Sequence, residues 1–241
     1  LTVYPYNSAG VIDAALGRSV LVIHDLISNH RSNTRLAARY IRVTQSVHRM
    51  LARPVCSASS YTLAQLRRLQ SFQRCALWLW SNPFYSFAAA LIDRPAKVAD
   101  DSPRPLRVLL CSGIGRNKDY AGALKLFRKS KLLAQAELRI LGFGDDAALA
   151  KRRISRMPEQ LQNRIRALPR LSLAEVALEY MNADLVWVHS RKEGFGRCVI
   201  EGLLSGRPVI ASDVGAVGSA VVDGRTGVLV PPGDPGALTG A

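Results

Sequence analysis

Short apolar runs alternate with amphipathic helical patterns through the second half of the chain, and this alternation limits the possible folds more than any other feature. The apolar runs, each of strand length, cover residues 106–112, 138–141, 185–189, 208–211 and 228–230. The helical patterns cover residues 120–133, 145–156 and 198–204. Such alternation predicts an α/β fold with a parallel sheet and helices on both faces. Ligands bind such sheets at the carboxyl ends of the strands, in the loops that lead to helices.

The first half of the chain shows a similar but shorter pattern. Strands are predicted at residues 1–6, 19–23, 55–56 and 76–80, and helices at residues 33–51 and 60–70. This is part of a Rossmann-like lobe, and we expect both ends of the chain to be incomplete. Residues 93–105 contain three prolines and few apolar side chains, which is typical of an exposed linker. We therefore predict an incomplete first lobe at residues 1–95, a linker at 96–105 and a second lobe at 106–241.

The composition is that of a globular protein, with 48% hydrophobic and 21% charged residues. It excludes disordered and collagen-like chains, and no apolar run approaches the roughly 18 residues of a membrane-spanning helix. The four cysteines are widely spaced and have no histidine cluster nearby, so they predict buried thiols rather than a disulfide framework or a metal site. We expect a cytoplasmic protein without a bound metal.

The net charge of +15 is concentrated in the first half, where residues 1–99 contain 12 Lys and Arg against three acidic residues. A basic surface suits nucleic acid, an anionic membrane or a phosphate-bearing substrate, and arginine-rich usage also follows from a GC-rich genome. The charge alone leaves these alternatives open. Arginines recur around the first long predicted helix, at Arg31, Arg35, Arg39, Arg42, Arg49 and Arg53.

Two glutamates enclose a glycine-rich turn late in the chain. Glu193 and Glu201 have seven residues between them, and the turn between them contains Gly194, Phe195 and Gly196. Glycines allow close backbone approach, and the amides that open the following helix form an anion site. Glu193, in the loop, is suited to accept hydrogen bonds from a sugar hydroxyl. Glu201, in the helix, is suited to accept them from a ribose diol; a purely structural helix-start turn is the alternative.

The second half also resembles the C-terminal half of glycosyltransferase family 4, the retaining nucleotide-sugar transferases of GT-B architecture. The resemblance covers residues 185–196, 201–212 and 223–234. These segments are similar, in order, to the family's strand with the paired glutamates, its helix-to-strand turn and its closing strand. The resemblance implies two Rossmann-like lobes with parallel sheets, of which the first is incomplete here.

Further residues take their roles from the same resemblance. Residues 108–119 are similar to the family's phosphate loop, which implies that Gly113, Arg116 and Lys118 bind the donor diphosphate. A Gly-x-Gly turn beginning at Gly142 follows the second strand rather than the first, so it does not indicate a dinucleotide site, and the resemblance implies that it lies near the nucleotide base. Residues 20–26 resemble a first-lobe strand ending in His-Asp, which implies that His24 faces the transferred sugar.

The resemblance thus implies a retaining glycosyltransferase that moves a sugar from a nucleoside diphosphate donor to an acceptor hydroxyl. The implied catalytic residues are Glu193, His24 and Lys118, and the nucleotide-sugar donor is a substrate rather than a cofactor. The Gly194–Gly196 turn and Glu201 complete the implied donor site. Ser219 stands where the family usually carries a glutamate, and a different donor choice follows if that glutamate seats the sugar or the loop.

The acceptor and the partners follow less directly. The resemblance implies a glycan or lipid-linked acceptor in bacterial polysaccharide or glycolipid synthesis. The basic first half predicts docking to an anionic membrane surface, on the inner face of the plasma membrane, and no nucleic-acid-binding motif is present. Two other readings remain open: a non-catalytic sugar-nucleotide-binding protein, and a sugar-nucleotide epimerase of the same architecture.

Overall fold

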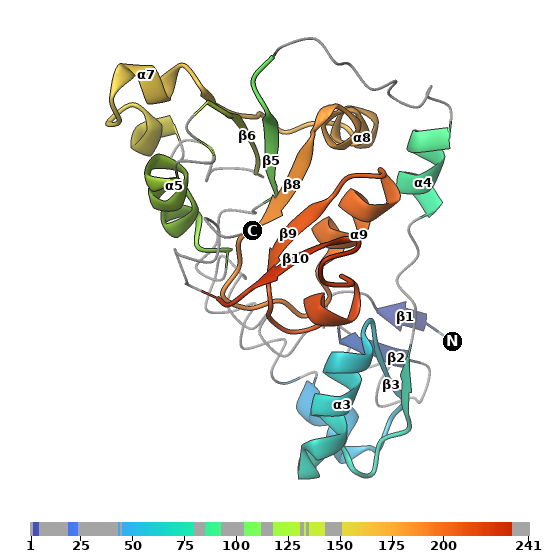
Figure 1. The fold of residues 1–241 in the computed structure, drawn as a ribbon. Coiled ribbons are helices and arrows are strands. Elements are labelled where there is room, and N and C mark those ends of the chain that lie inside the picture. The colour runs from blue at the N-terminus through green and yellow to red at the C-terminus, as the bar shows by residue number, and fades with distance from the viewer. Residues whose placement is uncertain are drawn as a thin grey trace. The chain divides into compact units, whose positions relative to one another are not determined.

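The computed structural model describes residues 2–4, 19–23, 43, 45–79, 85–92, 104–111, 118–130, 133, 135–142 and 151–232. The chain forms two compact units, one of Leu1–Pro83 with Glu193–Phe195 and the other of Phe84–Lys192 with Gly196–Ala241. Each unit contains one parallel sheet, and these are drawn in Figure 1. The predicted α/β class is therefore confirmed.

The second unit has a six-stranded parallel sheet in the order β10-β9-β8-β5-β6-β7. Its strands are β5 (Arg107–Cys111), β6 (Glu137–Leu141), β7 (Ile165–Ala167), β8 (Leu185–Val188), β9 (Val209–Ser212) and β10 (Gly227–Val230). The chain builds outward from β5 to β7, then returns to the other side of β5 and builds outward again. The strand order therefore reverses between β5 and β8, which is the doubly wound arrangement.

Helices cover both faces of this sheet (Figure 1). The helices are α4 (Tyr85–Ile92), α5 (Tyr120–Lys129), α7 (Glu159–Gln162), α8 (Leu173–Asn182) and α9 (Arg197–Leu204). Strand side chains alternate between faces: Val108 and Leu110 pack with α5, whereas Leu109 and Cys111 pack with α4, α8 and α9. Both sets are almost completely buried, as expected for strands covered on both sides.

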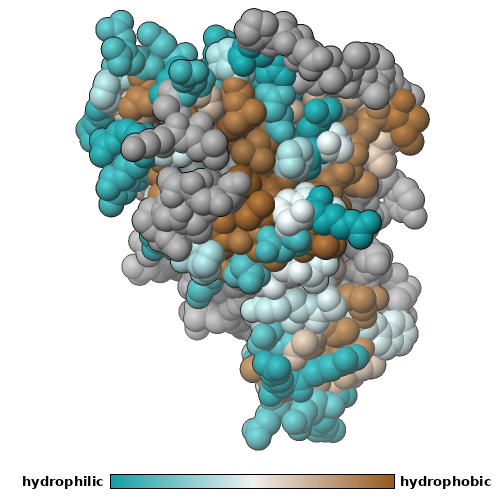
Figure 2. Space-filling model, in the orientation of Figure 1, coloured by the Kyte–Doolittle hydropathy of each residue, from teal (hydrophilic) through white to brown (hydrophobic). Residues whose placement is uncertain are grey.

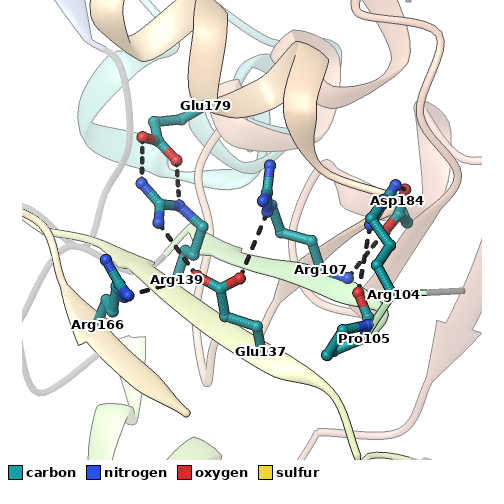
Figure 3. Close-up of polar contacts among 8 residues, drawn as sticks. All are labelled: Arg104, Pro105, Arg107, Glu137, Arg139, Arg166, Glu179 and Asp184. Atoms are coloured by element: carbon teal, nitrogen blue, oxygen red, sulfur yellow. Dashed lines mark hydrogen bonds and ion pairs between the residues drawn. The ribbon is translucent and has the colours of Figure 1, made fainter. Parts of the chain in front are cut away.

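Ion pairs hold α8 to the sheet on one of these faces, and Figure 3 shows them. Arg139 of β6 donates to both carboxylate oxygens of Glu179 on α8, at 2.6 Å each. Arg104 makes a similar two-bond contact with Asp184, also at 2.6 Å for each bond. Hydrogen bonding to Glu179 raises the pKa of Arg139, although burial opposes this shift. Such forked contacts fix geometry as well as charge, so the Arg139–Glu179 pair orients α8 on the sheet, and the Arg104–Asp184 pair joins the segments that lead into β5 and β8.

The first unit has a four-stranded parallel sheet in the order β1-β2-β3-β4. Its described elements are β1 (Thr2–Tyr4), β2 (Ser19–Ile23), β3 (Val55–Ser57), α3 (Ser60–Arg68), a 3-10 turn (Gln70–Phe72) and β4 (Leu77–Leu79). A small apolar core joins Leu21, Ile23, Val55, Leu66 and Phe72. Within this unit the Ser59 hydroxyl caps α3 and donates a hydrogen bond to the Gly194 carbonyl at 2.9 Å.

Every strand predicted from the sequence is present, but some elements were not predicted. These are α4, α7, α8 and β7. The predicted helices at residues 33–51 and 145–156 lie largely outside the described residues. The compact units divide between Pro83 and Phe84 because Phe87 of α4 is buried in the core of the second unit. The predicted linker at 96–105 falls almost wholly outside the described residues, so the predicted domain limits stay a prediction.

Within the described part of the chain, none of the helices is both long and apolar enough to cross a membrane. The same part contains no group of three or more His, Cys, Asp or Glu residues placed to hold a metal ion.

Gly227 offers a test of the β9–β10 pairing. A Cβ added at Gly227 would collide with the backbone carbonyl of Val209, whereas one added at Gly206 meets nothing within 4 Å. We expect Gly227→Ala to lower the free energy of unfolding by about 3 kcal/mol, because the strands must separate. Gly206→Ala costs about 1–2 kcal/mol, since only its positive φ of 67° is strained. Urea unfolding of both variants measures this difference, and equal losses would contradict it.

Candidate donor-binding site

The reversal of strand order places the candidate site in the second unit. β5 and β8 pair directly, with Leu109 opposite Val186 and Leu110 opposite Trp187, although β6 and β7 lie between them in sequence. The helices that follow these two strands, α5 and α9, pack on opposite faces of the sheet. Divergent helices leave a crevice at the carboxyl ends of such a strand pair, where doubly wound domains bind ligands.

Asp119 is the centre of a charged cluster in the segments that follow β5 and β8. It follows Lys118 and caps α5, where its Oδ1 accepts a hydrogen bond from the Gly122 amide at 3.3 Å. Its Oδ2 lies 3.0 Å from Nε of Arg191 and 3.5 Å from Nε2 of His189, both of which follow β8. Burial alone would raise the pKa of Asp119, but hydrogen bonding and the charge of Arg191 outweigh it and lower the pKa. The carboxylate therefore connects the segments that leave β5 and β8.

Asp119 also has an unusual backbone conformation. Its φ is 29° and its ψ is 47°, in the left-handed region that favours glycine. Aspartate enters this region more readily than most residues because its short side chain bonds locally. The contacts of its carboxylate with Gly122, His189 and Arg191 offset the backbone strain.

His189 is a buried member of the same cluster, with only 4% of its surface exposed. Burial lowers the pKa of this imidazole, and the nearby Asp119 carboxylate opposes the shift. Its ring lies 5.7 Å from that of Trp187. Its contacts with Trp187 and Asp119 indicate a structural role for His189.

Glu201 is buried on the inner side of α9, with 9% of its surface exposed. Its Oε2 accepts a hydrogen bond from the Tyr180 hydroxyl at 2.8 Å, and its Oε1 lies 3.3 Å from Nη2 of Arg197. Burial raises the pKa of Glu201, while Tyr180, Arg197 and the charge of Lys118 lower it. Lys118 and Glu201, both predicted site residues, follow the paired strands β5 and β8.

The glycines predicted for the site lie at strand and helix ends. Gly142 is buried directly after β6, and buried Gly196 caps α9 with a φ of 77°. A Cβ at Gly196 would lie 3.1 Å from a methyl group of Val217, so this position needs glycine for both its conformation and its close packing. Helix α9 therefore starts without a side-chain cap.

The remaining predicted residues do not belong to the described part of the second unit, except Ser219. Buried Glu193, buried Gly194 and half-buried Phe195 group with the first unit. His24, Gly113 and Arg116 lie outside the described residues. Ser219, in the 3-10 turn Val217–Ser219, donates its hydroxyl to the Ala216 carbonyl at 2.6 Å.

Sequence reasoning missed two residues of this site. Asp119 has a recognisable signal, because an aspartate directly before an amphipathic helix is a preferred N-cap. Tyr180 has no local signal: its hydroxyl meets Glu201 only through the packing of α8 against α9, from 21 residues away.

Doubly wound sheets bind their ligands at the switch point of the strand order, and these charged side chains follow the two strands that meet there. Comparison with known proteins identifies the family. The profile of the family "Glycosyl transferases group 1" matches residues 107–241, and the chain belongs to that family.

Curated relatives agree with this assignment. The chain is 32% identical over 139 residues to the D-inositol 3-phosphate glycosyltransferase of Corynebacterium diphtheriae, which covers 54% of this chain and 33% of the relative. It is 40% identical over 74 residues to the uncharacterized glycosyltransferase MJ1178 of Methanocaldococcus jannaschii, covering 31% of this chain and 21% of the relative. The matched part thus spans about a third or less of the length of these relatives.

Solved structures of glycosyltransferases share the fold. Sucrose-phosphate synthase from Thermosynechococcus elongatus superposes with a TM-score of 0.68 at 24% identity, over 92% of this chain and 57% of that one. Anabaena Alr3699/HepE, solved in complex with UDP-glucose, has a TM-score of 0.67 at 20% identity, over 96% of this chain and 64% of that one. These neighbours have the GT-B architecture, as predicted.

The strained backbone of Asp119 predicts a difference between two substitutions. Asp119→Ala and Asp119→Gly both remove the carboxylate, but only glycine adopts a positive φ without strain. We expect Asp119→Gly to be more stable than Asp119→Ala by about 1 kcal/mol, after the greater freedom of glycine in the unfolded chain is counted. Denaturant unfolding at pH 7 measures both variants. Lower stability of the glycine variant would show that the backbone at this position is not strained.

Proposed function

We propose that this chain is part of a retaining glycosyltransferase that uses a nucleoside diphosphate-sugar as donor. The observation that carries the proposal is the direct pairing of β5 with β8, because Lys118 follows β5 at the start of α5 and buried Glu201 follows β8 on α9. A cation and a carboxylate that follow such a strand pair match the two ends of a nucleoside diphosphate, which has an anionic diphosphate and a ribose diol. The complexes of Anabaena Alr3699/HepE with UDP and with UDP-glucose support this donor class.

The proposed reaction places the new bond on the same face of the sugar as the old one. The bond between the anomeric carbon and the diphosphate oxygen breaks, and the acceptor oxygen bonds to the same carbon. The acceptor proton passes to the departing diphosphate. Lys118, with Arg116, stabilises the negative charge that grows on this leaving group. In this proposal His24 contacts the transferred sugar.

The two glutamates have different proposed roles. Glu193 accepts hydrogen bonds from the transferred sugar, and these contacts strengthen as the bond to phosphate breaks. Glu201 accepts hydrogen bonds from the ribose, which does not change during the reaction. Glu201 therefore binds the ground state and the transition state equally.

These roles predict different kinetics for two substitutions in the intact protein. Glu193→Gln is expected to lower kcat by about 10- to 1000-fold, equivalent to the loss of one transition-state hydrogen bond of about 1.5–4 kcal/mol. Glu201→Gln is expected to raise the donor KM about tenfold, or about 1.4 kcal/mol. Steady-state kinetics across a panel of UDP-, GDP- and ADP-sugars, with melting curves, measure both. If both variants lose thermal stability but keep wild-type kcat and KM, the glutamates serve only the fold.

A non-catalytic sugar-nucleotide-binding protein is the alternative. It shares the nucleotide site, so calorimetry with UDP, GDP and ADP does not separate the two proposals. Consumption of a nucleotide-sugar by the intact protein does separate them, because only the enzyme releases the nucleoside diphosphate. An epimerase consumes no donor and instead changes the sugar of the recovered nucleotide-sugar.

We also propose that the basic first unit docks to an anionic membrane surface that carries a lipid-linked acceptor. The described residues 45–79 include Arg49, Arg53, Arg67, Arg68 and Arg74 and contain no acidic residue. The hydrophilic exposed side of α3, which includes Arg67 and Arg68, is seen in Figure 2. On β4, Trp78 and Leu79 are 62% and 53% exposed. Basic and exposed apolar side chains in one unit support interfacial binding.

Membrane docking by charge predicts salt-sensitive binding to vesicles. The protein is expected to sediment with vesicles of phosphatidylglycerol and phosphatidylcholine at 0.1 M salt, where the Debye length is about 10 Å. Binding is expected to fall at 1 M salt, where that length is about 3 Å, and to be weak for phosphatidylcholine alone. Equal binding to both kinds of vesicle would rule out docking by charge.

A further inference from the structure

Tyr180 is a buried polar residue that the proposed reaction has not yet used. Its side chain is 0% exposed, and its hydroxyl lies 2.8 Å from Oε2 of Glu201 and 3.4 Å from the Cys198 carbonyl oxygen. A phenol has one proton to donate, and the shorter, charge-assisted contact with the carboxylate takes it. Burial raises the pKa of Tyr180 well above its ordinary value, so the hydroxyl remains a donor at neutral pH.

The Glu201 carboxylate can accept further hydrogen bonds beside the one from Tyr180. An ionised carboxylate accepts about four hydrogen bonds; Tyr180 donates one to Oε2, and Arg197 donates one to Oε1. Arg197 is half-exposed and comes from the same helix, one turn away. Tyr180 comes from a different helix and is fully buried, so it is the more rigid of the two partners.

We propose that Tyr180 is a positioning residue, which holds the Glu201 carboxylate so that its remaining acceptor sites bind the ribose diol of the donor. This inference rests on the proposed function of the site. Tyr180 does not touch the donor, and it acts through Glu201 alone.

Contacts of α8 with its surroundings hold Tyr180 in a fixed position. Glu179, the residue before Tyr180, is held by the forked contact with Arg139 at 2.6 Å. The helix starts with a capping box between Ser172 and Glu175. The Tyr180 ring packs edge-to-face on Phe87 of α4, with 5.4 Å between the ring centroids. Contacts at the start of the helix, beside Tyr180 and on its ring therefore fix the direction of the hydroxyl.

The test compares UDP with 2′-deoxy-UDP as calorimetric probes of the wild-type protein and of Tyr180→Phe. The wild type is expected to bind UDP about tenfold more tightly than 2′-deoxy-UDP, because a site built for a hydroxyl rejects an analogue that lacks it. In Tyr180→Phe this ratio is expected to fall to about twofold, with UDP affinity reduced and 2′-deoxy-UDP affinity almost unchanged. A general structural defect would weaken both nucleotides equally.

Tyr120→Phe is the matched control. Tyr120 on α5 is also buried, and among the described residues its hydroxyl has no hydrogen-bond partner. Removing that hydroxyl is expected to leave the ratio at its wild-type value. A double-mutant cycle tests whether Tyr180 acts through Glu201. With Glu201→Ala already present, Tyr180→Phe is expected to cause no further loss of UDP affinity.

Each outcome decides the inference. An unchanged ratio in Tyr180→Phe, or an equal loss in the Glu201→Ala background, overturns the positioning role while leaving the proposed function intact. If the wild type binds UDP, GDP and ADP no better than buffer, the proposed function fails and the inference fails with it. Should Tyr180→Phe not fold, Phe87→Leu takes its place: loss of the supporting ring is expected to lower the ratio in the same direction, and an unchanged ratio overturns the inference.

Discussion

The parallel pairing of β5 with β8 is the contact on which the organisation of the second unit depends. It joins the first strand of the domain to the fourth, so the chain order reverses at this pair. Lys118 and Asp119 follow β5, and His189, Arg191 and Glu201 follow β8. The sheet is buried on both faces, with α5 on one side and α4, α8 and α9 on the other. Apolar burial thus fixes the place where the charged residues meet.

Two kinds of support then hold the charged groups in place. On the β5 side, the Asp119 carboxylate bonds to the start of α5 and to Arg191, at the cost of a left-handed backbone. On the β8 side, the Glu201 carboxylate accepts a hydrogen bond from the buried hydroxyl of Tyr180 on α8. Strained backbone and buried carboxylates with shifted pKa values cluster at the functional sites of proteins. The charged groups of the site are thereby set before a ligand binds.

The sequence was sufficient for every described strand except β7, but not for the contacts that hold the side chains of the candidate site. Apolar runs such as residues 106–112 and 185–189 predict buried strands because burial on both faces leaves a continuous apolar pattern. Helix α8 has two sequence signals that the prediction did not use, the Ser172-to-Glu175 capping box and the amphipathic spacing that buries Val176, Ala177 and Tyr180. Tyr180 and Arg139 act through contacts 21 and 40 residues away in sequence. Local sequence patterns do not show which residues so far apart in sequence come into contact.

Asp119 and Glu201 make opposite contributions to stability as the pH changes. The pKa of Asp119 is lower in the folded chain than its ordinary value, so its contribution is present above that value and is lost as the pH falls through the folded pKa. The pKa of Glu201 is raised, mainly by burial, so its contribution is present below the ordinary value and is lost as the pH rises through the folded pKa. A fall in pH thus removes the contribution of Asp119 and restores that of Glu201, so the two carboxyls have opposite effects on acid stability. Hydrogen-bond donors stabilise the charged form of a buried carboxyl and so offset the cost of its burial, as the Tyr180 hydroxyl does for Glu201.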